Sequence, residues 1–307
     1  MRRVLLMLSL AWAPAALAQP YVTGAPVPFA PEGFGHAVVS PTGERVALTS
    51  PSYAGVWVMD AAAGSVPRRL SDAVGAGFGM AWSPDGQRLA ARVARLDASG
   101  ARASQVVVLD AATGEETALT APSAGFVSAP RFSPDGTSVL SATADGVQVS
   151  ALADVPVSPS PAAGPVLGLD GAVLRAPGGA AFALPTPDAR VLRLVPSPDG
   201  RRVAVQVYGG DLYVANADGS GAVSLGRGEA PTWRPDGQYV AFMVTRDDGH
   251  ELLGSDLVVA RADGQQRRAL TRTEGVMEMY PAWLANDALL YDDVATGRVM
   301  RLPLSEN

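Results

Sequence analysis

One four-residue turn recurs along this chain and limits the folds that it can adopt. Ser-Pro-Asp-Gly occurs at 83–86, 133–136 and 197–200, and Arg-Pro-Asp-Gly occurs at 234–237. Proline fixes φ at the first central position of a β-turn, aspartate can accept hydrogen bonds from nearby backbone amides, and glycine takes the left-handed position that follows. An apolar strand precedes each copy and a further strand follows it, so each copy predicts a β-hairpin. Four clear copies predict a repeat architecture.

The strands around these turns form units of four, the first of which spans residues 35–70. Four-stranded units repeated around a ring form a β-propeller. The sequence therefore predicts an all-β protein, a single β-propeller of four-stranded blades. We expect seven blades, because the long gap between Pro134 and Pro198 fits two short units. Six blades are the alternative if residues 153–187 are only an elaborated loop.

The composition suits many short strands around a large core. The chain has 307 residues, of which 48% are hydrophobic, with 33 glycines and 25 prolines. The formal net charge is −6 and no basic run occurs, which argues against nucleic-acid binding. The absence of cysteine excludes disulfides, thiolate metal sites and cysteine nucleophiles. All 24 basic residues are arginine, which excludes a phosphate-loop lysine and a Schiff-base lysine.

Residues 1–18 have the pattern of a secretory signal peptide. Two arginines precede an apolar stretch, and Ala16-Leu17-Ala18 is a small-residue cleavage site. The apolar stretch is too short to span a membrane, and no second hydrophobic span follows. We therefore expect cleavage before Gln19 and a periplasmic or secreted bacterial protein. A short lead of residues 19–34 then precedes the propeller, which we place at residues 35–304.

The last predicted unit is one strand short when the chain ends at Asn307. A ring of blades is commonly closed by strands from both ends of the chain in one blade, which protects the last open edge. We therefore expect a closing strand around residues 25–30, within the lead. The protein is also expected to be a monomer.

The repeat resembles that of TolB-type propellers, which are similar to WD40 propellers. The resemblance is carried by the turn at 82–86, by a strand that ends before a glycine turn at 213–219, and by Ala269-Leu270-Thr271. It covers residues 35–304 and implies a β-propeller. TolB proteins carry an N-terminal α/β domain before the propeller, and the short lead predicts that this domain is absent here. The envelope-integrity role of that family is therefore not transferred directly.

The longer loops gather at one end of the predicted propeller. Loops between the second and third strands of a blade share a face with the loops that run into the next blade, and function on such scaffolds lies more often on long loops. We call this end the loop-rich face. The candidate binding residues on it are Tyr53, Phe78, Phe126, Tyr208, Arg227, Glu229, Asp247, Asp248, His250, Glu251, Glu278 and Tyr280. The opposite face carries the repeated turns, whose residues are interpreted as structural: Pro84, Asp85, Gly86, Pro134, Asp135, Gly136, Pro198, Asp199, Gly200, Pro235, Asp236 and Gly237.

The segment Arg246–Glu251 is the one polar cluster that suggests a metal. Its three carboxylates and one histidine could bind a divalent cation, but a solvated hairpin loop is the favoured interpretation. His36 lies at the start of an inner strand and is interpreted as structural. No metal site and no cofactor are predicted.

Nucleophilic catalysis finds little support in the sequence. No Gly-x-Ser-x-Gly elbow and no His-Glu-x-x-His pattern occur, and His36 and His250 are the only histidines. The sequence predicts an exported, non-catalytic propeller that binds a protein or peptide, or acts as a scaffolding module of the cell envelope. The alternative is a propeller enzyme, a glycan lyase or hydrolase with its site at the channel mouth on the loop-rich face.

Overall fold

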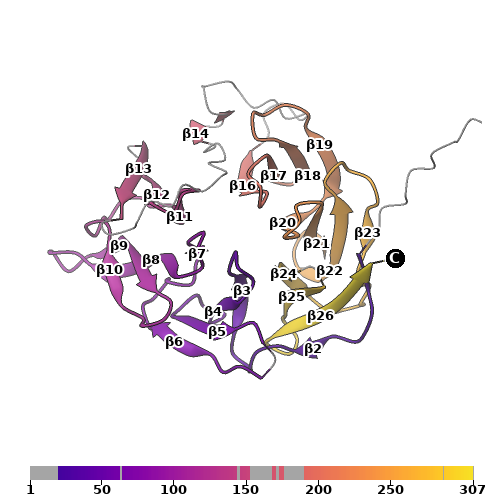
Figure 1. The fold of residues 1–307 in the computed structure, drawn as a ribbon, viewed down its shortest axis with the longest axis horizontal. Helices are drawn as coiled ribbons and strands as arrows, with labels where there is room; N and C mark the ends of the chain where they lie inside the picture. Colours follow the sequence, from indigo (N-terminus) through magenta and orange to yellow (C-terminus); the bar gives the residue numbers. More distant parts are fainter. Residues whose placement is uncertain are drawn as a thin grey trace, which may run out of the picture.

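The computed structural model of the chain is an all-β propeller (Figure 1). The structure describes residues 20–62, 64–143, 146–152, 168–170, 173–175, 190–285 and 287–306. Within these residues, six sheets of three or more strands stand as blades around a common centre. The predicted signal peptide, residues 1–18, lies outside the described part of the chain.

Four blades have four strands that pair antiparallel in chain order, with the first strand innermost and the fourth outermost. The first two of these blades contain β3 (Gly35–Val39), β4 (Arg45–Thr49), β5 (Val56–Asp60), β6 (Arg68–Ser71), β7 (Ala81–Trp82), β8 (Arg88–Leu96), β9 (Arg102–Asp110) and β10 (Glu116–Ala118). The other two contain β16 (Val191–Pro196), β17 (Arg202–Val207), β18 (Asp211–Asn216), β19 (Val223–Arg227), β20 (Glu229–Trp233), β21 (Tyr239–Asp247), β22 (Leu252–Arg261) and β23 (Arg268–Ala269).

The prediction of seven blades is wrong, and the described residues form six. The blade after β10 has three strands in the described residues, β11 (Arg131–Phe132), β12 (Ser138–Thr143) and β13 (Gly146–Ala151). Where a further blade was expected, the described residues show only the hairpin of β14 (Gly168–Asp170) with β15 (Val173–Arg175). Strands of three residues bury little apolar surface. In the described residues, the long gap in the spacing of the turns therefore adds no seventh blade.

The last blade combines segments from opposite ends of the chain. Its three long strands are β24 (Glu278–Leu284), β25 (Ala288–Asp293) and β26 (Arg298–Glu306), in that order from the centre. Two short strands, β1 (Pro20–Val22) and β2 (Val27–Pro28), pair antiparallel with the outer edge of β26. The blade is thereby covered by residues that precede β3 in the chain.

The repeated turns have the geometry that their residues predict. In the first copy, the Gly86 amide donates to the Ser83 carbonyl at 2.9 Å, and the Gln87 amide donates to Asp85 Oδ1 at 3.0 Å. The Arg88 amide donates to Ser83 Oγ at 2.9 Å. The glycine of every clear copy has a positive φ, as expected of this turn: Gly86 (67°), Gly136 (71°), Gly200 (67°) and Gly237 (70°).

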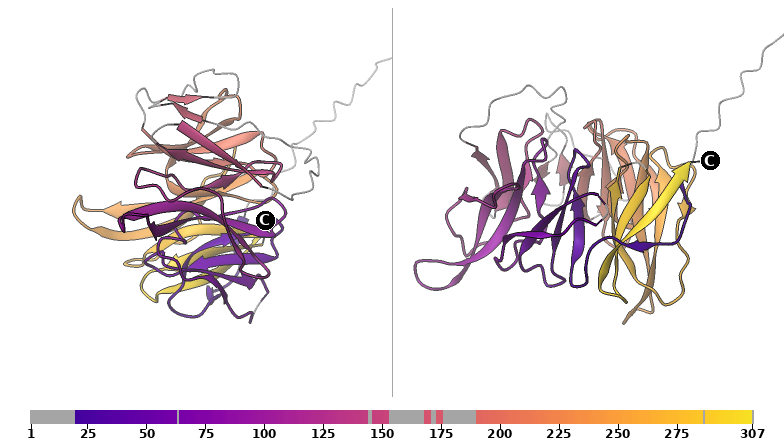
Figure 2. Two further views of the ribbon diagram at one scale, coloured as in Figure 1. Left: turned by 90° about the vertical axis from the view of Figure 1, so that its left-hand side faces the viewer. Right: turned by 60° about the horizontal axis from the view of Figure 1, so that its bottom comes forward.

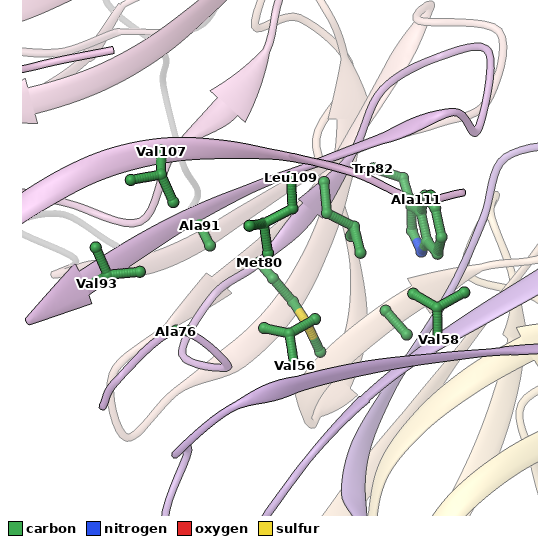
Figure 3. Packing of buried hydrophobic residues seen from close by; sticks show 12 residues of the cluster. Val56, Val58, Ala76, Met80, Trp82, Ala91, Val93, Val107, Leu109 and Ala111 are labelled. Carbon is green, nitrogen blue, oxygen red and sulfur yellow. The ribbon is translucent and has the colours of Figure 1, made fainter. Parts of the chain in front are cut away.

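The core lies between neighbouring blades. Strands in the middle of a blade are covered on both faces, so β4 and β17 are buried almost throughout and do not alternate between buried and exposed positions. Between the first two blades, Val56 and Val58 pack against Met80, Trp82 and Leu109 (Figure 3). Similar clusters fill the other described interfaces. Blade-to-blade packing therefore holds the inner strands in fixed positions around the centre.

Two long hairpins, β8–β9 and β21–β22, extend the loop-rich face beyond the other blades (Figure 2). Each consists of strands of nine or ten residues, and their tips expose Leu96 and Leu253. In the part of the chain that the structure describes, no helix is long and apolar enough to cross a membrane.

Candidate functional site

The innermost strands carry a recurring β-bulge near their starts. The pairing register of β3, β16, β20 and β24 with the next strand shifts at this point. In each inner strand we take the residue directly before the repeated turn and count three positions back. This position is occupied by His36 in β3, Arg193 in β16, Ala230 in β20 and Tyr280 in β24. We call this the bulge position. Bulges re-aim side chains and are over-represented beside binding sites.

The bulge position is also where the backbone adopts the left-handed region. His36, Ala230 and Tyr280 have φ values of 52°, 49° and 52°, and Gly79, which holds the same place before β7, has 69°. A residue with a Cβ costs roughly 1–2 kcal/mol in this conformation. Strain of this kind clusters at functional sites. The loop-rich ends of the inner strands are therefore candidates for a site.

Four aromatic side chains from three neighbouring blades and their loops form what we call the aromatic row: Tyr280, His36, Tyr53 and Phe78. The His36 ring stacks on Tyr53, with centroids 4.3 Å apart and planes at 21°, and lies 4.4 Å from Tyr280. Tyr53 meets Phe78 edge-on at 5.3 Å. The guanidinium of Arg92 lies 5.2 Å from the Phe78 ring, and its Nη1 donates to the Val127 carbonyl at 2.6 Å.

Asp292, at the end of β25, holds the backbone of His36. The His36 amide donates to Asp292 Oδ2 at 2.8 Å and to Oδ1 at 3.0 Å, and Nδ1 lies 3.6 Å from Oδ2. Burial raises the pKa of Asp292 to about 7, although the His36 amide opposes the shift. Burial, and then the charge of Arg193, lower the pKa of His36 to about 4. At neutral pH the imidazole is therefore uncharged and acts as a hydrogen-bonding group.

Two arginines reach the centre from other blades, and we call Arg131 and Arg193 the arginine pair. Both side chains are exposed although they lie on innermost strands, so solvent reaches the central channel. Crowding by protein lowers the pKa of both guanidinium groups, with a further contribution to Arg131 from the charge of Arg193. Guanidinium stays protonated in proteins. In the described part of the chain, neither arginine forms an ion pair with a carboxylate.

The phenol of Tyr53 is a neutral donor at neutral pH. Burial is the largest of the causes that raise the pKa of Tyr53 to about 12. The charge of Tyr280, a hydrogen bond with Tyr280 and the charge of Asp292 also raise this pKa, whereas the charge of Arg193 lowers it. Arg193 interacts electrostatically with Tyr53, Tyr280 and His36. One cation thus faces three of the four members of the aromatic row.

Three of the predicted binding residues, Tyr53, Phe78 and Tyr280, belong to this site. Two further predicted aromatic residues, Phe126 and Tyr208, make no ring contact with the row in the described residues, and they are 64% and 68% exposed. Tyr208 instead lies 5.9 Å from the Arg190 guanidinium.

The predicted polar residues on the β21–β22 hairpin mostly shape the hairpin itself. Asp248 Oδ1 accepts from the amides of His250 at 2.9 Å and Glu251 at 2.8 Å, which hold its pKa below the ordinary value. Asp247 pairs with Arg227 at 3.3 Å. Among the residues that the structure describes, no three His, Asp or Glu side chains are placed to hold a metal ion.

The two remaining predicted carboxylates are engaged within the fold. Glu229 Oε1 accepts from Thr245 Oγ1 at 3.0 Å. Glu278 is 3% exposed and accepts from the hydroxyls of Thr271 and Thr273. Burial raises the pKa of Glu278. Glu229 thereby links β20 to β21, Glu278 links β24 to the loop before it, and neither residue belongs to the aromatic row.

Several residues of the site were not predicted. His36 was interpreted as structural, and Arg92, Arg131, Arg193 and Asp292 were not among the candidates. The alignment of the repeats contains a signal that could have found two of them, since His36 and Arg193 share the bulge position with Tyr280. Arg131 and Asp292 have no such signal, because the folded ring brings them to the centre.

A separate groove of about 540 Å³ lies between the β7–β10 and β11–β13 blades. It contains no member of the aromatic row or the arginine pair. Its lining residues are Thr120, Ala121, Pro122, Ser123, Val127, Thr143, Gly146, Val147 and Gln148.

Comparison with known proteins identifies the fold. No family model and no curated protein sequence matches the chain. Among solved structures, TolB from Acinetobacter baumannii matches with a TM-score of 0.53 and 17% identity over 83% of this chain. The putative TolB from Agrobacterium tumefaciens matches with 0.51 and 17% over 90% of this chain and 91% of its own. The Cps50 (Swd1) β-propeller domain of Myceliophteria thermophila matches with 0.63 and 13% over 92% of this chain and 100% of its own.

The resemblance to TolB-type, WD40-like propellers is confirmed at the level of the fold. The chain spans 58% of the length of the Acinetobacter TolB. At these identities the likeness concerns the arrangement of strands, so the chemistry has to be argued from the side chains of this chain.

Proposed function

We propose that this protein is an exported, non-catalytic β-propeller of the cell envelope that binds a segment of a partner protein at the loop-rich end of its central channel. One observation carries the proposal. Rings from separate blades converge where the inner strands begin, Arg193 interacts with three of them, and the backbone at His36 and Tyr280 is held in a strained conformation. Tyrosine and arginine are the side chains that most often dominate protein interfaces.

The backbone strain supports a binding role because the propeller fold can form without it. A propeller can place glycine at the bulge position, as it does at Gly79, whereas His36 and Tyr280 keep large side chains there. The His36 ring stacks on Tyr53 and also contacts the Tyr280 ring, which holds both side chains in place. A surface held in this way loses little conformational entropy when it binds.

The proposal is tested by capturing partners from the native envelope with the purified protein. Tyr53→Ala with Tyr280→Ala should lose the cross-linked partner that the wild type retains. Phe126→Ala with Tyr208→Ala is the matched control, because it removes two exposed aromatic side chains of the loop-rich face outside the row. Equal capture by all three proteins would refute the proposed site.

A propeller enzyme is the second candidate, and one observation favours it. The neutral imidazole of His36, the neutral phenol of Tyr53 and the Arg193 cation lie together at the channel mouth. A glycan lyase needs a group that takes a proton beside a sugar carboxylate and a cation that neutralises the carboxylate. A panel of acidic glycans, assayed for unsaturated sugar products, tests this candidate. Turnover that is lost in Tyr53→Phe and His36→Asn would favour the enzyme.

A further inference from the structure

The charges at the channel mouth distinguish this site from the rest of the surface. The chain is acidic overall, with 30 Asp and Glu against 24 basic residues. Other arginines form ion pairs with carboxylates, as in Arg95–Glu116, Arg246–Asp256 and Arg298–Glu32. The arginine pair has no such partner among the described residues, although its members are close enough for one to lower the pKa of the other.

The groups around Arg193 are hydrogen-bond donors. The hydroxyl of Tyr53 and the imidazole of His36 are uncharged at neutral pH, because the pKa of Tyr53 is raised and that of His36 is lowered, and both groups can donate. The carboxyl group of Asp292 lies beside His36, and both of its oxygens accept from the His36 amide. A cluster of cations and donors at a channel mouth favours an anion from outside the chain.

From this arrangement we infer that the bound partner segment is an acidic peptide, which places a carboxylate on Arg131 and Arg193 and an adjacent apolar or aromatic side chain on the aromatic row. This inference rests on the proposed function and specifies its ligand. Guanidinium groups bind carboxylates with charge-assisted hydrogen bonds. The row adds an extended ring surface from Tyr280 to Phe78, which is larger than an isolated ion requires.

The residues divide the recognition between them. The arginine pair supplies the charge, and it comes from β11 and β16, on blades other than those that supply the row. His36, in β3, and Tyr280, in β24, supply the rings that face Arg193. A peptide that contacts both the arginine pair and the aromatic row therefore has to enter the channel.

The probe for the inference is a rhodamine-labelled peptide in which two glutamates flank a tryptophan, with a matched peptide that carries two glutamines instead. Fluorescence anisotropy at low salt should show the wild type binding the glutamate peptide about 10-fold or more tightly than the glutamine peptide, since a hydrogen bond to a charged group contributes about 1.5–3 kcal/mol. Raising the salt concentration should weaken the binding of the glutamate peptide more than the binding of the glutamine peptide. Equal binding of the two peptides would overturn the inference.

Variants separate the two parts of the site. Arg131→Gln with Arg193→Gln should remove the preference for glutamate. The control, Arg69→Gln with Arg201→Gln, removes the same charge from exposed positions in the outermost strand β6 and beside a repeated turn, and should change the affinity less than about 2-fold. Urea denaturation of each variant checks that it is folded. Preference retained without Arg131 and Arg193 would overturn the inference.

The outcomes also separate this inference from the proposed function. If the native partner is lost in Tyr53→Ala with Tyr280→Ala but kept in Arg131→Gln with Arg193→Gln, the proposed function stands and the acidic ligand is wrong. If no variant affects capture, both are wrong. If an oligogalacturonate binds the arginine pair and the glutamate peptide does not, the ligand is an acidic glycan and the inference is overturned in favour of the enzyme.

Discussion

At the scale of single residues, His36 and Asp292 form a pair with opposing titrations. The pKa of His36 falls from its usual 6.5 to about 4, so its contribution to stability is present above pH 6.5 and is lost as the pH falls through 4. The pKa of Asp292 rises from 3.8 to about 7, so its contribution is present below pH 3.8 and is lost as the pH rises through 7. Between about pH 4 and 6.5 the two slopes oppose each other, and the pair binds one proton throughout.

We therefore predict that a substitution of either residue makes the stability depend on pH between about 4 and 6.5, where the two opposing effects cancel in the wild type. Relative to the wild type, Asp292→Asn should gain stability as the pH rises from 4 to 6.5, by about 3 kcal/mol from the shift of His36. His36→Asn, which suits the left-handed backbone, should lose stability over the same range. Urea denaturation across this range measures both. Parallel profiles for the three proteins would contradict the prediction.

Ala285 provides a test of backbone strain away from the site. It is exposed and has a φ of 53° in the weak last copy of the repeated turn, where no Pro-Asp-Gly occurs. Ala285→Gly should raise the free energy of unfolding by about 1 kcal/mol, because glycine adopts this region without steric cost. The control is Ala295→Gly, an exposed alanine without a positive φ, which should not stabilise the protein. Equal effects at the two positions would show that strain is not the cause.

At the scale of elements, the repeated turn and the long hairpin should respond differently to substitution. Gly86 has a φ of 67°, and a Cβ there would lie 3.2 Å from Thr42 Oγ1. We expect Gly86→Val to cost about 2 kcal/mol or more, because a β-branched residue is poorly tolerated at positive φ. His250→Ala with Glu251→Ala, at exposed positions of the β21–β22 hairpin, should cost less than about 0.5 kcal/mol. Thermal unfolding compares them, and similar losses would make the hairpin tip part of the scaffold.

The elements also show what a sequence can specify. Turn residues act locally, so the turns, their positive φ values and strands such as Val56–Asp60 could be predicted. The number of blades could not, because it depends on whether weak strands such as β14 gain enough packing to form a sheet. Tyr53, Phe78 and Tyr280 were found because they lie in or beside long loops. Their convergence with Arg193 depends on ring geometry, which no local pattern reports.

At the scale of the whole molecule, stability should depend on the lead. β1 and β2 pair with β26, and the Thr23 and Phe29 amides donate to carbonyls of the same strand at 3.1 and 2.9 Å. We predict that deleting residues 19–31 lowers the free energy of unfolding by several kcal/mol and promotes aggregation, because it exposes the edge of β26. Urea denaturation and light scattering measure the two effects. An unchanged unfolding midpoint would mean that the pairing contributes little.

The pairing of Pro20 with Glu306 places two residues from opposite ends of the chain side by side. The order in which the blades are connected should therefore be changeable by circular permutation. A chain in which a short linker joins Glu306 to Pro20, and which opens between Ser99 and Gly100 at the exposed tip of the β8–β9 hairpin, should fold to the same ring and bind the same ligand. A permutant that opens within the buried strand β4 should not fold. The propeller would then have no obligatory first blade.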